Sequence, residues 1–123
     1  MNKKKVLVID DELTIRLVLK ELIEDLGYDF LESGRAMQGI EILKNNKVDL
    51  ILLDIQLPQM NGLEAIQKIR EINKEVPVFM ITAFHNLKDV VEMLDVEIQE
   101  FISKPFDLEN LQNKMKEYLK GDE

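Results

Sequence analysis

The chain has 123 residues, of which 46% are hydrophobic and 33% are charged, and it contains no cysteine. This length and composition fit one globular domain with its own core, and they exclude a disordered chain or a disulfide-stapled scaffold. The formal net charge of −8 disfavours direct binding to nucleic acid, which needs a basic surface. The apolar run at 6–9 is too short for a signal-peptide core or a membrane span, so we expect a cytoplasmic protein with no membrane partner.

Strand-like and helix-like segments alternate along the whole chain. Apolar runs and alternating patterns predict strands over 6–9, 28–32, 49–54, 76–82 and 100–103. Stripes of apolar residues at helical spacing predict helices over 12–26, 36–45, 62–72, 86–96 and 107–120. Gly27 is placed to end the first helix, and Asp107 is placed to cap the last. This alternation predicts an α/β fold in which helices cover both faces of a mostly parallel sheet.

The segment 50–62 joins a buried strand to a turn rich in Pro, Asn and Gly. Asp54 stands where the apolar run ends, so its carboxylate should lie at the carboxyl end of a strand, where open α/β sheets bind ligands. Parallel strands all end at the same edge of a sheet, so polar residues that follow the other strands should gather around Asp54. These residues are Asp10, Asp11, Thr82 and Lys104.

Three carboxylates at one site repel one another unless a cation compensates their charge. Mg²⁺ (or Mn²⁺) binds one or two carboxylates and also accepts phosphate oxygens. The metal and Lys104 would neutralise the oxygens of a phosphoryl group while Asp54 attacks its phosphorus. The residues therefore predict phosphoryl transfer to Asp54, assisted by Thr82 and Lys104, at a metal site that contains Asp10 and Asp11.

The chain resembles the receiver domains of two-component response regulators over nearly its whole length. Four segments carry the resemblance: VIDDE at 8–12, LLDIQLP at 52–58 with Asn61-Gly62 after it, ITA at 81–83 and FISKPF at 101–106. The resemblance implies one receiver domain over residues 1–123, with strand order 2-1-3-4-5 and five flanking helices, similar to free-standing single-domain receivers. It also implies that a histidine kinase or histidine phosphotransferase phosphorylates Asp54, and that the domain then switches conformation to signal.

The resemblance assigns roles to further residues. The metal ligands it implies are Asp10, Asp11, Asp54 and the backbone carbonyl of Gln56. Thr82 would move to a phosphoryl oxygen, Phe101 would turn inward as a switch, and the Lys104–Pro105 bond would be cis. Phe101 is equally well explained as a static core residue. Such a domain catalyses its own phosphorylation and slow dephosphorylation, but it is not a turnover enzyme.

Apolar residues beside the predicted pocket suggest a docking surface for the phosphodonor, because exposed apolar patches near an active site often mark partners. Leu13 and Leu17 lie off the main stripe of the first helix. The docking residues we predict are Leu13, Ile15, Leu17, Val18, Phe84, Pro105 and Phe106. Several of them could instead be the fringe of the core, and Phe84 could also shield the aspartyl phosphate from water. A further, downstream protein target is also expected.

Two other functions and one departure from the family pattern stay open at this point. A phosphatase similar to the haloacid dehalogenases would need a second Asp two residues after Asp54, where this chain has Gln56. A flavin-binding module would need a hydroxyl- and glycine-rich loop after the first strand, where Asp10 and Asp11 would repel phosphate. Receiver domains often have a Gly-Ala pair before the fifth strand, and the residues here are Glu97-Ile98, so we expect the preceding helix to end differently.

Overall fold

The computed structural model describes residues 3–57, 60–83, 92 and 95–120. Five parallel strands form one sheet in the order β2-β1-β3-β4-β5. The strands are β1 (Lys5–Ile9), β2 (Asp29–Ser33), β3 (Leu50–Asp54), β4 (Val78–Thr82) and β5 (Glu100–Ser103). The helices with described bounds are α1 (Leu13–Asp25), α2 (Ala36–Asn45), α3 (Gly62–Ile72) and α5 (Leu108–Tyr118). The predicted fold class and strand order are confirmed, while most of the helix predicted over 86–96 lies outside the described residues.

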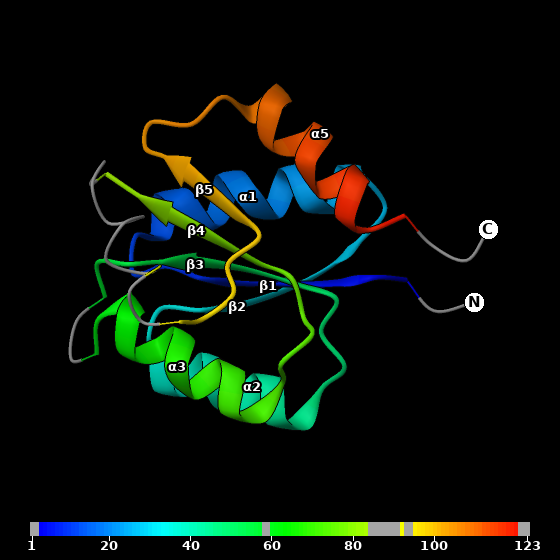
Figure 1. Cartoon of the computed structure of the whole chain (residues 1–123). Helices are drawn as coiled ribbons and strands as arrows, with labels where there is room; N and C mark the ends of the chain where they lie inside the picture. The colour runs from blue at the N-terminus through cyan, green and yellow to red at the C-terminus, as the bar shows by residue number, and fades with distance from the viewer. Residues whose placement is uncertain (1–2, 58–59, 84–91, 93–94, 121–123) are drawn as a thin grey trace.

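The sheet is the middle of three layers. Helices α1 and α5 cover one face, and α2 and α3 cover the other (Figure 1). Successive side chains of β1 alternate between these layers: Val6 and Val8 pack on the α1 and α5 side, while Leu7 and Ile9 pack on the α2 and α3 side. Burial on both faces explains why the central strands read as continuous apolar runs. Within the described ranges, no helix is long and apolar enough to cross a membrane.

Local signals in the sequence set the ends of the helices. Gly27 follows α1 with φ of +89°, a conformation that favours glycine. The carboxylate of Asp107 caps α5, because its Oδ1 accepts a hydrogen bond from the Glu109 N–H at 2.9 Å. Gly62 is the first residue of α3, and it packs directly against the backbone that follows β3. A Cβ at position 62 would lie 2.5 Å from the Cα of Ile55, so any side chain there would force the loop beside Asp54 to move.

Three apolar residues that lie on or beside the apolar stripes of their helices are exposed. Val18, Ile72 and Leu108 are 38%, 39% and 42% exposed. Leu108 is the first residue of α5, and Ile72 is the last residue of α3. Val18 is turned by about 100° around the helix from Leu19, which is fully buried. For the helices with described bounds, the periodicity therefore gave the correct location but a buried face that is too wide.

A buried arginine ties α3 to the segment that enters β5. The Arg70 guanidinium donates to the Val76 carbonyl at 2.7 Å, and its Nε and Nη2 donate to the Glu97 carbonyl at 3.1 and 2.7 Å. Nη2 also lies 3.2 Å from Oε1 of Gln99, which in turn accepts the Val78 N–H. Glu97, one of the two residues where the chain departs from the family pattern, is thus held through its backbone.

Replacing Arg70 should destabilise the whole domain. Arg70→Ala removes the donor to the buried Val76 carbonyl and leaves a cavity, and we expect it to lower the free energy of unfolding by about 3 kcal/mol. Lys68→Ala is the matched control, because it removes a positive charge from the exposed side of the same helix. Urea denaturation of both variants measures the difference. Equal stability of the two variants would show that the Arg70 contacts contribute nothing to the fold.

Candidate functional site

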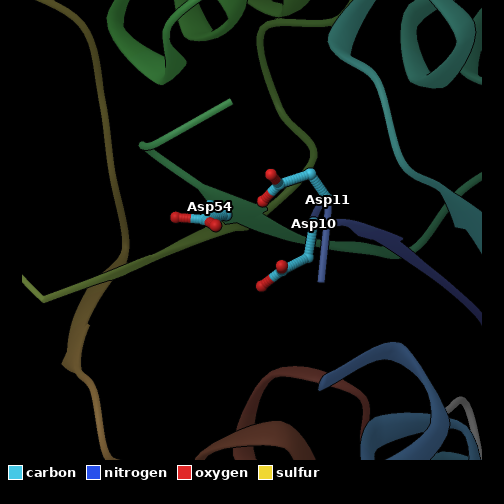
Figure 2. A group of neighbouring side chains, drawn as sticks. All are labelled: Asp10, Asp11 and Asp54. Carbon is cyan, nitrogen blue, oxygen red and sulfur yellow. The ribbon is translucent and has the colours of Figure 1, made fainter. Parts of the chain in front are cut away.

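The register of the sheet brings the acidic residues together. Ile9 of β1 pairs with Leu53 of β3, so the next residues, Asp10 and Asp54, leave the sheet side by side at its carboxyl edge. Figure 2 shows Asp10, Asp11 and Asp54 extending to the same side from the ends of these two strands. One carboxylate oxygen from each lies within 4.8 Å of the others. The predicted convergence of these three carboxylates is therefore present in the structure.

Two of the carboxylates are buried, and each fixes its own loop. Asp10 is 1% exposed and Asp54 is 2% exposed, whereas Asp11 is exposed. Oδ1 of Asp10 accepts the Glu12 N–H at 2.9 Å, and Oδ1 of Asp54 accepts the Gln56 N–H at 3.0 Å. Both contacts are turns in which an aspartate binds the backbone two residues later. The other oxygen of each carboxylate, Oδ2, remains directed toward Lys104.

Lys104 enters the site from the end of β5. Its Nζ lies 3.1 Å from Oδ2 of Asp10 and 3.2 Å from Oδ2 of Asp54. The Lys104 N–H donates to the carbonyl of Thr82 at 2.8 Å, and the Lys104–Pro105 peptide is cis, as the resemblance implies. Thr82 is buried at the end of β4. One ammonium group therefore faces two buried carboxylates, and Asp11 adds a third negative charge at the same edge.

The charges in the site shift the pKa values of its groups. Burial raises the pKa of Asp54, the Gln56 N–H opposes this shift, and the neighbouring Asp10 carboxylate adds to it. Burial alone would lower the pKa of Lys104, but the charges of Asp10 and Asp54 outweigh that effect and raise it. Lys104 is therefore firmly cationic at neutral pH, while Asp54 lies in a pocket that disfavours its negative charge.

The donor set fits a hard divalent cation. Oδ2 of Asp10 is buried and pairs with Lys104 Nζ at 3.1 Å, and no other described residue donates a hydrogen bond to it. A carboxylate oxygen has more than one lone pair, so this oxygen can also coordinate a metal. Asp10, Asp11 and Asp54 could therefore hold Mg²⁺ together, and the metal would supply charge compensation for phosphate oxygens.

Loss of the Asp54 charge should stabilise the metal-free domain. Because the folded-state pKa of Asp54 is raised, protonation of this carboxyl stabilises the folded state. This stabilisation is fully present below the ordinary pKa of 3.8 and is lost as pH rises through the folded-state pKa. Asp54→Asn should therefore melt a few degrees above the parent at pH 7 in the presence of a chelator, and this difference should shrink toward pH 3. Calorimetry across this range measures it. A variant that melts below the parent at pH 7 would contradict the direction of this shift.

The remaining predicted site residues occupy varied positions. Gln56 is exposed, and its N–H faces Asp54. Phe101 is half-buried and packs on the core between the sheet and α2 and α3. Leu13 and Leu17 are 58% and 56% exposed on α1.

The other predicted docking residues differ in their exposure. Val18 and Pro105 are exposed, and Phe84 lies outside the described residues. Ile15 and Phe106 are half-buried against the core between the sheet and α1 and α5. These two side chains can therefore offer a partner only part of their surface.

Sequence reasoning missed Arg16, which lies directly behind the acidic site. Its Nη1 donates to the backbone carbonyl of Asp10 at 2.6 Å, and its Nε pairs with Oε1 of Glu32 at 2.8 Å. No motif marks this residue. A charged residue on the inner side of α1, just after the Asp10-Asp11 pair, was the signal available in the sequence.

The fold and the pocket define a class: open α/β domains that carry an acidic, lysine-containing site at the carboxyl edge of a 2-1-3-4-5 sheet. The sequence model of the response regulator receiver domain matches residues 6–116. The chain belongs to this family, as predicted. It is therefore a receiver domain of two-component signalling, a class of domain that is phosphorylated on aspartate, and the phosphatase and flavin-binding alternatives are set aside.

Individual relatives agree with this assignment. Sporulation initiation phosphotransferase F of Bacillus subtilis (strain 168) is 29% identical over 119 residues, which cover 97% of this chain and 96% of that protein. A CheY-like receiver domain protein from Methanospirillum hungatei JF-1 superposes with a TM-score of 0.90 at 29% identity, covering 97% of this chain and 95% of that one.

Two further comparisons are narrower in what they show. The receiver domain of sensor histidine kinase PA1611 from Pseudomonas aeruginosa PAO1, solved with a magnesium ion in its active-site cleft, has a TM-score of 0.84. It is 24% identical over 98% of this chain and 100% of that one, a likeness that shows the fold alone. Other curated relatives are transcriptional regulators, and the chain spans only 50% to 53% of their length.

Proposed function

We propose that Asp54 is the phosphoryl acceptor of this receiver domain and that the donor is a phosphohistidine on a sensor histidine kinase or a histidine phosphotransfer protein. The observation that carries the proposal is the position of the Asp54 carboxylate. It is buried at the end of the central strand, 3.2 Å from the Lys104 ammonium and in one cluster with two further carboxylates. An oxygen of Asp54 forms the new bond to phosphorus while the donor's phosphorus–nitrogen bond breaks, and the imidazole leaves with the electron pair of that bond.

Several surrounding residues would stabilise the negative charge on the oxygens of the phosphoryl group. Asp10, Asp11, Asp54 and the backbone carbonyl of Gln56 are the proposed ligands of Mg²⁺ (or Mn²⁺), which supplies positive charge to the phosphoryl oxygens when bound. Lys104 already spans the Asp10 and Asp54 carboxylates, and it would turn to a phosphoryl oxygen once the metal takes its share of their charge. Thr82 follows Ile81, the residue of β4 that pairs with Asp54, and its hydroxyl would bond another phosphoryl oxygen.

The signal would leave the site through β4 and β5. Phosphorylation adds about −1.5 to −2 charges and new acceptor oxygens, which would draw Thr82 and Lys104 inward. Phe101 lies on β5, three residues before Lys104, and it is half-buried, so an inward turn would bury more of its ring. We propose that Thr82 and Phe101 form the switch, as a shift of population between two packings that a downstream protein target reads.

Residues 1–123 would form one receiver unit that catalyses its own phosphorylation and slow dephosphorylation rather than the turnover of a separate substrate. The single sheet supports this, because both of its cores contain residues from all five strands. Its partners would be phosphodonor and target proteins, with no direct contact to nucleic acid. A cytoplasmic location remains a prediction from the sequence.

The test of the proposed function is direct. The protein is incubated with acetyl phosphate and Mg²⁺, and the intact protein is weighed by mass spectrometry. We expect a gain of one phosphoryl group. Absence of any gain, with the folded protein verified by circular dichroism, would overturn the assignment.

The exposed face of α1 should matter only for a protein donor. Leu17→Ala removes a side chain that is 56% exposed, and we expect phosphotransfer from a phosphohistidine donor protein to slow about tenfold, the effect of losing one buried leucine contact. Transfer from acetyl phosphate should stay unchanged. Met37→Ala, at a residue 52% exposed on α2 across the sheet, is the matched control. Equal slowing with both donors would contradict a docking role for Leu17.

A further inference from the structure

Arg16 holds the backbone that presents the first two carboxylates of the site. Its guanidinium is mostly buried, with 18% of the side chain exposed. Nη1 donates to the Asp10 carbonyl at 2.6 Å, and Nε donates to Oε1 of Glu32 on β2 at 2.8 Å. A Cβ at Gly34 would lie 3.1 Å from the same Nη1, so the group is also packed against the turn that follows β2.

These contacts act at the residue where the chain leaves β1. The Asp10 N–H donates to the Ser33 carbonyl at 3.0 Å, and Oδ1 of Asp10 accepts the Glu12 N–H. With the Arg16 contact to its carbonyl, Asp10 is fixed at its backbone N–H, its backbone oxygen and one carboxylate oxygen. The remaining oxygen, Oδ2, faces the Lys104 ammonium at 3.1 Å. The three contacts to the rest of Asp10 set the position from which that oxygen points.

We propose that Arg16 is a positioning residue for the cation site. It links the Asp10 carbonyl to β2 and thereby orients the Asp10 and Asp11 carboxylates. The inference rests on the proposed function, because it assumes that these carboxylates bind Mg²⁺. Residues that orient metal ligands from behind usually change metal affinity by about 10- to 100-fold when they are replaced. The planar guanidinium suits this role, since it reaches two acceptors from one rigid group.

Electrostatics alone makes the opposite prediction. Arg16 is a positive charge beside a site for a positive ion, so its removal should strengthen cation binding if charge were its only influence. The positioning role predicts weaker binding. The sign of the change in Mg²⁺ affinity therefore separates the two effects.

The test is a titration of the metal-free protein with Mg²⁺, followed by calorimetry and by backbone amide NMR shifts, at a temperature where circular dichroism shows each variant to be folded. Arg16→Ala should weaken Mg²⁺ binding about tenfold. It should also shift the amide signals of Asp11 and Glu12 before any metal is added. Lys20→Ala is the matched control, because it removes a positive charge from the same helix, where Lys20 pairs with the exposed Glu24 at 3.1 Å. The Mg²⁺ affinity of this variant should equal or slightly exceed that of the parent.

Arg16→Lys keeps the charge and the aliphatic stem, so it tests the role even if Arg16→Ala does not fold. A single ammonium cannot reproduce the two-acceptor geometry, and we expect an affinity between those of the parent and Arg16→Ala. Unchanged or tighter Mg²⁺ binding in Arg16→Ala, or full recovery in Arg16→Lys, would overturn the inference. A parent protein that binds no Mg²⁺ would instead overturn the proposed metal site itself.

Discussion

Asp54→Asn should gain no phosphoryl group from acetyl phosphate and Mg²⁺ under conditions that label the parent fully. The substitution keeps the size and shape of the side chain, and its amide oxygen can still accept the Gln56 N–H. An amide lacks the negative charge that makes a carboxylate a nucleophile. We expect the loss to be complete within the sensitivity of intact-mass measurement, the largest effect of any single substitution in the domain.

The neighbouring carboxylates make the control for this experiment essential. Asp49→Asn is the matched variant, because Asp49 lies just before the start of the same strand, where its Oδ2 accepts the Lys5 N–H at 2.8 Å. It should be labelled at the rate of the parent. Retained labelling of Asp54→Asn would assign the acceptor to another residue, with Asp10 and Asp11 the first to examine. Loss of labelling in Asp49→Asn as well would indicate damage to the strand rather than to the acceptor.

Removal of divalent cations should have the second largest effect. With a chelator present, the charges of Asp10 and Asp11 would repel an incoming phosphoryl group, and Lys104 alone cannot compensate them. We expect the labelling rate to fall by about 100-fold or more, the scale on which loss of one electrostatic stabiliser of a transition state acts. The rate is followed by intact mass at a fixed concentration of acetyl phosphate, and it should recover when Mg²⁺ is added in excess.

The same cation should stabilise the fold in proportion to its affinity. At a Mg²⁺ concentration 100 times its dissociation constant, the gain is about 2.7 kcal/mol, a rise in melting temperature of several degrees. Asp11→Asn should lose much of this gain at little cost to the metal-free protein, because Asp11 is exposed. A labelling rate that chelation leaves unchanged, together with an unchanged melting temperature, would exclude a role for a metal.

The sequence predicted the sheet and the acidic edge well because both depend on local patterns. The strands β1, β3 and β4 are apolar runs that end in a polar residue or are followed by one, and the parallel order then places Asp10, Asp54 and Thr82 at the same edge. Burial was harder to predict at the helix ends. Leu108 and Ile72 carry apolar side chains in helical register, yet they are exposed at the first residue of α5 and the last residue of α3.

Two arginines show what the sequence could not reveal. Arg16 and Arg70 are charged residues on helices, and their positions in the sequence resemble those of solvated side chains. Their partners include the backbone carbonyls of Asp10, Val76 and Glu97. Every residue has such a carbonyl, so the sequence does not show which of them accepts a hydrogen bond from an arginine. Such contacts depend on how separate elements meet in space, so only the assembled tertiary structure brings them out.

The turn that Asp54 makes with its own loop limits how the proposed phosphorylated state can be imitated. Oδ1 of Asp54 reaches the Gln56 N–H at 3.0 Å, a span set by the short aspartate side chain. Glutamate, a customary stand-in for a phosphorylated aspartate, is one methylene longer and would carry its carboxylate past that N–H. The phenotype of cells that carry such a substitution would then reflect a disturbed loop next to the acidic cluster. It should be compared with the phenotype of Asp54→Asn before it is attributed to constitutive signalling.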